Sequence, residues 1–319
     1  MRVFFTVDVE VWCDSWNALD RTFGDSFSRY IYGPTSKGDY GLPFKLALLR
    51  DHGLAGVFFV EPLFATRFGM QPLEEIVGLI NDGNQEVQLH LHTEWVDEAL
   101  ERLLPGVDGK RQYLWMFSKE EQVRLIAAGN ALLQRAGARA PSAFRAGSFG
   151  LGRDTWSALR QCGFRFDSSY NPSMIRRESG ILVENVPTQP FEVDQVFEYP
   201  VTVYRDGFGR LRHAQLTASA YRELERLLWH AAEAGWGTVV IVSHSFELLN
   251  SRKDRPDRVV VERFRKLCTF LDRNRATFVT SGFSGLEPET DGSQPPPANI
   301  PVHLTGLRVA EQVWRRIAA

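Results

Sequence analysis

The sequence has few cysteines, little net charge and no long hydrophobic run. Its three cysteines, Cys13, Cys162 and Cys268, are odd in number and scattered, which argues against a disulfide framework. With 37 basic and 39 acidic residues, the formal net charge is -2, so nothing indicates a nucleic-acid partner or an anionic membrane. No apolar run approaches membrane-spanning length, and the amino terminus enters a predicted strand directly, without a leader-like segment. We therefore expect a soluble cytoplasmic protein without a membrane span.

What the sequence does contain is a regular alternation of short apolar runs and helical patterns. At 319 residues, the chain has room for one large α/β domain or two small ones. The strand–helix unit recurs about seven times, although no sequence repeat accompanies it, and this predicts parallel strands with helices outside. A barrel and a doubly wound sheet both satisfy that pattern.

The individual elements follow from hydrophobic periodicity, glycine stops and one capping box. Strands are predicted around His90 and at residues 3–7, 57–60, 143–145, 164–167, 238–243 and 276–279. Helices are predicted at residues 43–52, 72–82, 118–135, 154–162, 218–234 and 258–274. Residues 181–186 and 196–204 carry extended patterns, which suit a local hairpin or an insertion. Residues 11–41 are predicted to form a long loop, and loops of that length are usually functional.

Two of these predicted strands end in residues that suit a metal. His90 and His92 are two apart on a strand, so their imidazoles share one face, and Glu94 lies just beyond. Asp8 and Glu10 share a face at the end of the first strand by the same rule. Paired imidazoles with carboxylates are ligands for a divalent metal such as zinc. Histidines that only hydrogen-bond, and acids that cap a helix, would produce the same pattern.

Three further residues lie at predicted strand ends, where parallel α/β folds place their catalytic groups. Arg145 can orient a carboxylate through its planar guanidinium, or it can form a surface ion pair. Asp167 brings an acid to the end of another strand. His244 follows the most apolar strand of the chain, and at that place a histidine is a candidate for acid–base chemistry.

Taken in order, these segments resemble the motifs of the polysaccharide deacetylase family, carbohydrate esterase family four. The matching segments are residues 6–10, 90–93, 144–146, 166–169 and 242–244. The resemblance covers roughly residues 1–283, and it looks most similar to a branch associated with lipopolysaccharide biosynthesis. It implies a distorted (β/α) barrel over residues 1–285, followed by a proline-rich linker and a short helix at residues 286–319. The implied activity is removal of N- or O-acetyl groups from a sugar of a cell-surface polysaccharide or its precursor.

The resemblance also implies a role for each candidate residue. Asp8 would be the general base and His244 the general acid. Arg145 would hold Asp8, and Asp167 would help to orient His244. Glu10, His90 and His92 would bind a divalent metal, with zinc as the first candidate.

The sequence departs from the family pattern at the metal site. Val9 stands where the family has a metal-binding Asp, and Glu10 is the nearest replacement. The two histidines are closer together than is usual, so either His92 or Glu94 completes the site, or the fold works without a metal. Two alternatives therefore remain: a metal-free amidase acting on a small C–N substrate, and an inactive binding or scaffold barrel in glycan assembly.

Overall fold

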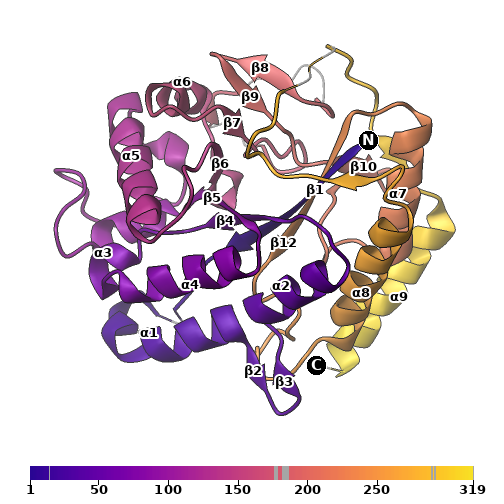
Figure 1. The fold of residues 1–319 in the computed structure, drawn as a ribbon, viewed down its shortest axis with the longest axis horizontal. Helices are drawn as coiled ribbons and strands as arrows, with labels where there is room; N and C mark the ends of the chain where they lie inside the picture. The colour runs from indigo at the N-terminus through magenta and orange to yellow at the C-terminus, as the bar shows by residue number, and fades with distance from the viewer. Residues whose placement is uncertain (14, 176–178, 182–186, 289, 291, 319) are drawn as a thin grey trace. The chain divides into compact units, whose positions relative to one another are not determined.

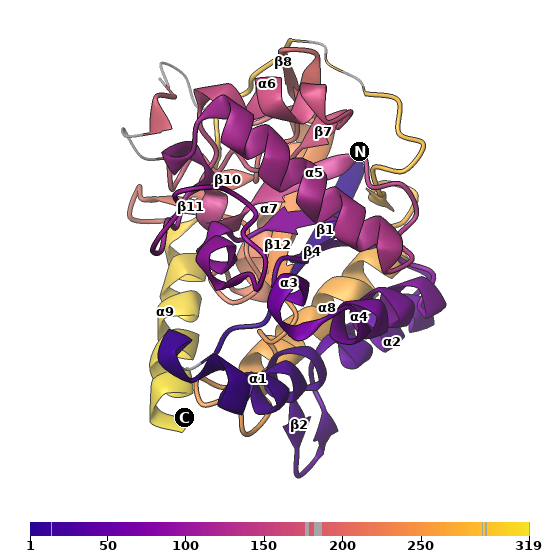
Figure 2. The ribbon, with the colours of Figure 1, turned by 90° about the vertical axis from the view of Figure 1, so that its left-hand side faces the viewer.

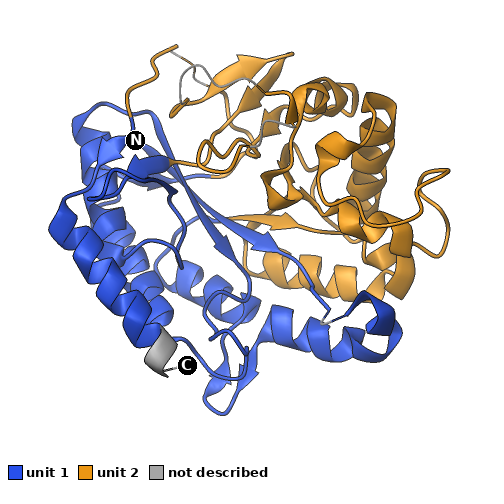
Figure 3. Ribbon diagram, turned by 180° about the vertical axis from the view of Figure 1, so that it is seen from behind, with its two compact units in different colours: residues 1–56, 203–281, 297–319 blue, residues 57–202, 282–296 orange. Residues whose placement is uncertain are grey.

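The computed structural model of the protein describes residues 1–13, 15–175, 179–181, 187–288, 290 and 292–318. The chain divides into two compact units, each assembled from separate stretches of sequence (Figure 3). The first unit consists of residues 1–56, 203–281 and 297–319, and the second consists of residues 57–202 and 282–296. Both units combine parallel strands with helices.

The centre of the first unit is strand β1 (Arg2–Val9), which pairs in parallel with β12 (Thr238–His244) and with β13 (Val279–Thr280). Every residue of β1 after Arg2 is buried, as expected for a strand covered on both faces. The register places Asp8 opposite His244. The two predicted catalytic residues therefore leave the sheet at the same strand end.

Helices of the first unit pack through apolar stripes. The helices are α2 (Leu42–Asp51), α7 (Tyr221–Glu233), α8 (Arg258–Arg273) and α9 (Val302–Ala318). Helix α7 contacts both α8 and α9, and the three lie side by side in Figure 1. Leu224, Leu227, Leu228 and Ala231 of α7 are buried at helical spacing. A small three-stranded sheet of β10 (Val203–Arg205), β11 (Leu211–His213) and β14 (Ala298–Asn299) completes the unit.

The prediction of a long loop at residues 11–41 is wrong. This segment contains three helical elements, η1 (Trp16–Ala18), α1 (Leu19–Phe27) and η2 (Ser28–Tyr32). They are followed by a hairpin of β2 (Pro34–Thr35) and β3 (Gly38–Asp39), and this hairpin projects from the unit in Figure 2. Helix α1 forms because Leu19 and Phe23, four residues apart, are both buried on one side. Its apolar stripe is only two turns long and the helix contains an exposed glycine, Gly24, so the sequence pattern is weak.

The second unit contains the strand that carries the two candidate histidines. Its strands follow the order β4 (Val57–Val60), β5 (Glu86–Leu91), β6 (Ala143–Ala146), β7 (Phe166–Asp167) and β9 (Val196–Glu198), all parallel, with β8 (Phe191–Val193) antiparallel at the edge. Its helices are α3 (Ala65–Phe68), α4 (Gln71–Asp82), α5 (Lys119–Arg135) and α6 (Arg153–Gln161). Short 3-10 turns lie at Thr93–Glu98, Leu114–Met116 and Gly147–Phe149.

Most predicted elements lie where the periodicity placed them. Ser118 and Glu121 form the predicted capping box at the start of α5. Residues 196–204 contribute β9 and the start of β10, whereas residues 182–186 of the other extended pattern lie outside the described residues. Helix α9 occupies the end of the chain, where a short helix was expected, and the predicted domain boundary at residue 285 stays a prediction. None of the helices within the described ranges combines the length and apolar character needed to cross a bilayer.

Candidate functional site

Three of the predicted residues meet at the ends of β1 and β12 in the first unit. His244 Nε2 lies 3.9 Å from Asp8 Oδ2 and 3.8 Å from Glu10 Oε1. Asp8 and Glu10 are almost fully buried, whereas the His244 side chain keeps 23% of its surface exposed. An imidazole that faces two carboxylates and is open to solvent can exchange a proton with a substrate.

The other nitrogen of His244 is held by Glu247, a residue that the sequence reasoning did not select. Nδ1 lies 2.9 Å from Glu247 Oε1, three residues along the turn that follows β12. The same oxygen accepts hydrogen bonds from Thr217 Oγ1 at 3.1 Å and from Gln215 Nε2. Because an ionised carboxylate only accepts, Nδ1 is the donor, and this orients Nε2 toward Asp8 and Glu10.

This environment favours the protonated form of His244. Burial on its own would lower the pKa of His244, but the hydrogen bond and the charge of Glu247, followed by the charges of Glu10 and Asp8, raise it to about 9. Burial likewise disfavours the charge of Glu247, yet the hydrogen bond and charge of His244 and the nearby Lys45 leave its pKa below the usual value. The pair is therefore an imidazolium and a carboxylate at neutral pH, and the imidazolium can act as an acid.

In the second unit, His90 and His92 lie at the end of β5 with their Nδ1 atoms engaged. His90 Nδ1 is 2.8 Å from the carbonyl oxygen of Arg145, and His92 Nδ1 is 3.2 Å from Glu94 Oε2. Both partners are acceptors, so the hydrogen of each neutral imidazole is assigned to Nδ1 and the lone pair to Nε2. Metal-binding histidines are typically held in this way.

Gly147 supports this arrangement sterically. A Cβ atom added at this position would lie 2.7 Å from His92 Nδ1 and 2.8 Å from the Leu91 carbonyl oxygen. Ser148 and Phe149, which follow it, have φ values of 53° and 52°, a conformation that is uncommon for residues other than glycine. Backbone strain of this kind is often found at functional sites, and here it directly follows Gly147, the residue that abuts His92.

Arg145 is a buried residue, so the alternative of a surface ion pair is wrong. Its side chain is 0% exposed and donates hydrogen bonds to the Ser168 carbonyl oxygen at 3.0 Å and to Ser168 Oγ at 2.9 Å. Its guanidinium also lies over the Phe59 ring, 4.3 Å from the centroid. The expected pairing of Arg145 with Asp8 stays a prediction.

Asp167 forms a pair of buried carboxyl groups with Glu198, its partner in the register of β7 and β9. Burial raises the pKa of Asp167 to about 6, and burial together with the charge of Asp167 raises that of Glu198 well above its usual value. Ser169 donates to Asp167 through its backbone amide at 3.1 Å and through its hydroxyl. The group that contacts His244 Nδ1 in the structure is Glu247. The expected role of Asp167 as an orienting group for His244 stays a prediction.

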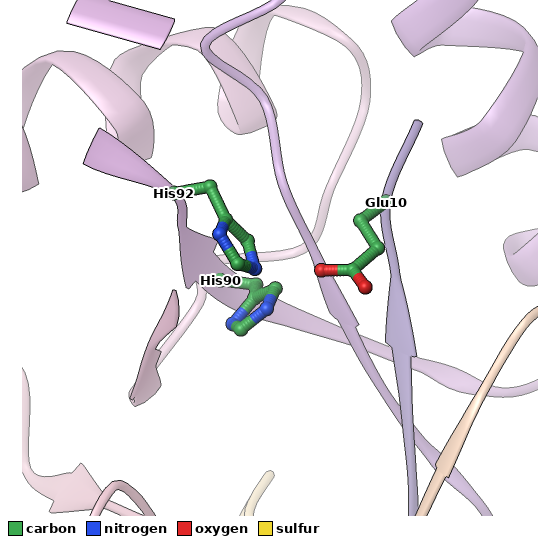
Figure 4. A group of neighbouring side chains, drawn as sticks. All are labelled: Glu10, His90 and His92. Carbon is green, nitrogen blue, oxygen red and sulfur yellow. The ribbon is translucent and has the colours of Figure 1, made fainter. Parts of the chain in front are cut away.

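Glu10, His90 and His92 form a group that could hold a metal ion, and Figure 4 shows their three side chains. All three are buried, and each offers one ligand atom. One carboxylate and two imidazoles are the donor set of several catalytic zinc sites. Glu94 accepts the hydrogen bond from His92 Nδ1, which leaves His92 Nε2 to bind a metal. This contact favours His92, and not Glu94, as the third ligand.

Sequence comparison and structural comparison differ in what they find. Neither a family model nor a curated protein matches the sequence. Among solved structures, the chain is similar to a candidate polysaccharide deacetylase from Mycobacterium smegmatis, with a TM-score of 0.56 and 18% identity over 92% of this chain and 94% of that one.

The chain is also similar in structure to a glucanotransferase and to a branching enzyme. The match to a 4-alpha-glucanotransferase from Thermococcus litoralis has a TM-score of 0.55 and 11% identity, over 94% of this chain and 42% of that one. The match to a family 57 branching enzyme from Thermococcus kodakaraensis has a TM-score of 0.54 and 13% identity, over 94% and 72%. At these identities the likeness establishes the fold, and the predicted distorted (β/α) barrel with mostly parallel strands is confirmed.

Proposed function

We propose that the protein is a metal-dependent hydrolase that removes N- or O-acetyl groups from a sugar. The observation that carries the proposal is the His244–Glu247 pair, in which Glu247 holds Nδ1 and Nε2 faces two buried carboxylates at a strand end. A protonated histidine beside a carboxylate supplies the acid and the base that hydrolysis of an amide requires.

In the proposed reaction, Asp8 and His244 divide the proton transfers. Asp8 takes a proton from the attacking water, and His244 Nε2 gives its proton to the leaving nitrogen or oxygen. Glu247 keeps the imidazole ring oriented and stabilises its positive charge, because its carboxylate accepts from Nδ1. In the protein without a metal, the pKa of His244 is about 9, so the ring carries the proton at neutral pH.

Glu10, His90 and His92 would hold the metal through one carboxylate oxygen and the two Nε2 atoms. A bound zinc ion would lower the pKa of a coordinated water to about 7 and polarise the acyl carbonyl. Nitrogen and oxygen donors make zinc the first candidate.

A sugar substrate is supported by the aromatic side chains near His244. The Phe246 ring lies 5.5 Å from the His244 ring, and the Tyr30 ring lies 4.8 Å from Phe246. The ammonium group of Lys253 lies over both rings, 4.7 Å from the Tyr30 centroid and 5.2 Å from the Phe246 centroid, so the cluster offers a cation and aromatic edges to a polar sugar. The barrel is also shared with a candidate polysaccharide deacetylase, a 4-alpha-glucanotransferase and a family 57 branching enzyme in complex with glucose. We propose an acetylated cell-surface glycan or its precursor, and lipopolysaccharide precursors are a specific case to test.

Acetate release from N-acetylated and O-acetylated oligosaccharides tests this function. The wild-type protein loaded with zinc should release acetate, and chelation should abolish the release. His244→Ala should reduce turnover by on the order of 10²–10⁴, the usual contribution of a positioned acid. His303→Ala, an exposed histidine on α9, is the matched control and should retain turnover.

Three outcomes would contradict the proposal. Turnover that survives removal of all metal would favour the metal-free amidase, above all if small C–N substrates are cleaved faster than acetylated sugars. Tight binding of a glycan without any acetate release would favour the binding barrel. Near-full turnover of an amide substrate by His244→Ala would remove His244 as the acid.

A further inference from the structure

Lys45 is a buried lysine in the first unit to which the proposed reaction assigns no role. It lies in the first turn of α2, its side chain is 0% exposed, and its ammonium group lies 4.7 Å from the centre of the Phe264 ring on α8. Burying an ammonium group is costly unless it is paired, and a methionine would fill a similar volume without that cost. Burial lowers the pKa of Lys45 to about 8, while the charges of Glu247 and Cys268 raise it in part. A group retained at this cost calls for a function.

The hydrogen bonds of Lys45 lead to His244. Lys45 Nζ lies 2.8 Å from Ser243 Oγ, and Ser243 Oγ lies 3.1 Å from Glu247 Oε2. Glu247 Oε1 then accepts from His244 Nδ1 at 2.9 Å. Ser243 and Glu247 are themselves buried, so water does not compete strongly for these bonds.

The direction of each bond follows from the chemistry of the groups. An ammonium group has only hydrogens to give, so the Ser243 oxygen must accept from Lys45. The single hydroxyl hydrogen of Ser243 is then directed to Glu247 Oε2. Glu247 is thus held at both oxygens, by Ser243 at Oε2 and by Gln215, Thr217 and His244 at Oε1.

We infer that Lys45 and Ser243 are positioning residues that fix the Glu247 carboxylate, so that its Oε1 stays aligned with His244 Nδ1. This inference rests on the proposed function, in which His244 donates a proton to the leaving group. Without Lys45, the Ser243 hydroxyl is no longer forced to donate to Oε2, and the carboxylate can rotate about its terminal torsion. The His244 ring then loses its fixed orientation, although the substrate contacts are unchanged.

The test compares Lys45→Met with Ser243→Ala, their double variant, and Lys266→Met as the control. Lys266 is an exposed lysine on α8, with 54% of its side chain exposed. We expect Lys45→Met and Ser243→Ala each to lower kcat by on the order of tenfold, with KM within about twofold, a size usual for groups that orient an active residue. The double variant should be no slower than the slower single variant, because both changes break one chain of bonds. Lys266→Met should match the wild type.

A spectroscopic readout separates positioning from structural support. In the wild type, the Nδ1–H proton of His244 should give a sharp downfield NMR resonance, and in Lys45→Met this resonance should be broadened or lost. The melting temperature of Lys45→Met should be equal to or above that of the wild type, because a buried charge is removed. A loss of kcat that is matched by a lower melting temperature, with the resonance intact, would show that Lys45 is only structural and would overturn the inference.

The same resonance distinguishes a failure of this inference from a failure of the proposed function. If no acetylated sugar is hydrolysed, the proposed function fails, and the NMR comparison still decides whether Lys45 and Ser243 order His244. If turnover is present but Lys45→Met and Ser243→Ala leave both kcat and the resonance unchanged, the positioning role is refuted while the hydrolase stands.

Discussion

Replacing Glu247 with glutamine is the most direct test of why His244 carries a proton. The substitution keeps the size of the side chain and removes its charge. Glutamine has only one acceptor oxygen, whereas the carboxylate oxygens of Glu247 accept from His244, Gln215, Thr217 and Ser243. The variant therefore loses the charge and at least one of the contacts that hold the side chain at position 247.

The size of the effect follows from the pKa of His244. A rise from 6.5 to about 9 corresponds to about 3 kcal/mol in favour of the protonated form. Glu247 is the first of the groups that raise this pKa, ahead of Glu10 and Asp8. We expect the variant to have a His244 pKa of about 7, so that at pH 8 the protonated fraction falls from about 90% to about 10%. Turnover of an amide at pH 8 should fall about tenfold for this reason alone, and the loss should be smaller at pH 6.

The pKa is best measured by NMR titration of the His244 ring in protein stripped of metal, because a metal at Glu10 would alter the charge next to Nε2. Glu262→Gln, on the exposed side of α8 with 56% of its side chain exposed, is the matched control and should leave the titration unchanged. A His244 pKa in Glu247→Gln within about half a unit of the wild-type value would refute the assignment of Glu247 as the stabilising group.

Three further predictions follow from the described contacts. Gly147→Ala should displace His92 through the added Cβ and lower bound zinc, measured by elemental analysis, while the far-UV spectrum stays native; full zinc occupancy would contradict this. Arg308→Met, which leaves two buried carboxylates without their cation, should destabilise the protein by about 3–5 kcal/mol in urea unfolding. Because the folded-state pKa values of Asp167 and Glu198 are raised, the protonated pair stabilises the fold at low pH, and the contribution of Asp167 is lost as the pH rises through about 6, that of Glu198 as the pH rises through its own raised pKa. The melting temperature of Glu198→Gln minus that of the wild type should therefore be larger at pH 8 than at pH 5, and an equal difference at both pH values would contradict the raised pKa values of the pair.

The strands and the residues at their ends were predictable from the sequence. Asp8 and His244 each follow a short apolar run, and His90 lies near the end of an alternating strand pattern; in parallel sheets such residues emerge at the strand end where sites form. The period of two also placed Glu10 beside Asp8 and His92 beside His90. These inferences needed only the hydrophobic pattern of each strand and the rule that parallel sheets form sites at the carboxyl ends of their strands.

The supporting residues could not be predicted in the same way. Glu247 lies in a turn, where no periodicity indicates which way a side chain points, although its spacing of three from His244 was a usable signal. Lys45 lies on the buried side of α2, a place that a lysine rarely occupies, so its residue type gave no signal for burial. The burial of Arg145 depends on Phe59 and Ser168, which are distant in sequence and become neighbours only in the folded unit.

The pairing of β1 with β12 has a consequence for biosynthesis. Thr6 of β1 donates to the carbonyl oxygen of Ile241 in β12, which lies 235 positions later in the chain. During translation, β1 therefore leaves the ribosome long before β12 does. Residues 57–202, the larger part of the second unit, emerge in between and can fold first. During that interval the apolar strand β1 is exposed and prone to aggregation. Slow translation or loss of a chaperone should therefore lower the amount of active protein more than it lowers the total amount of protein synthesised.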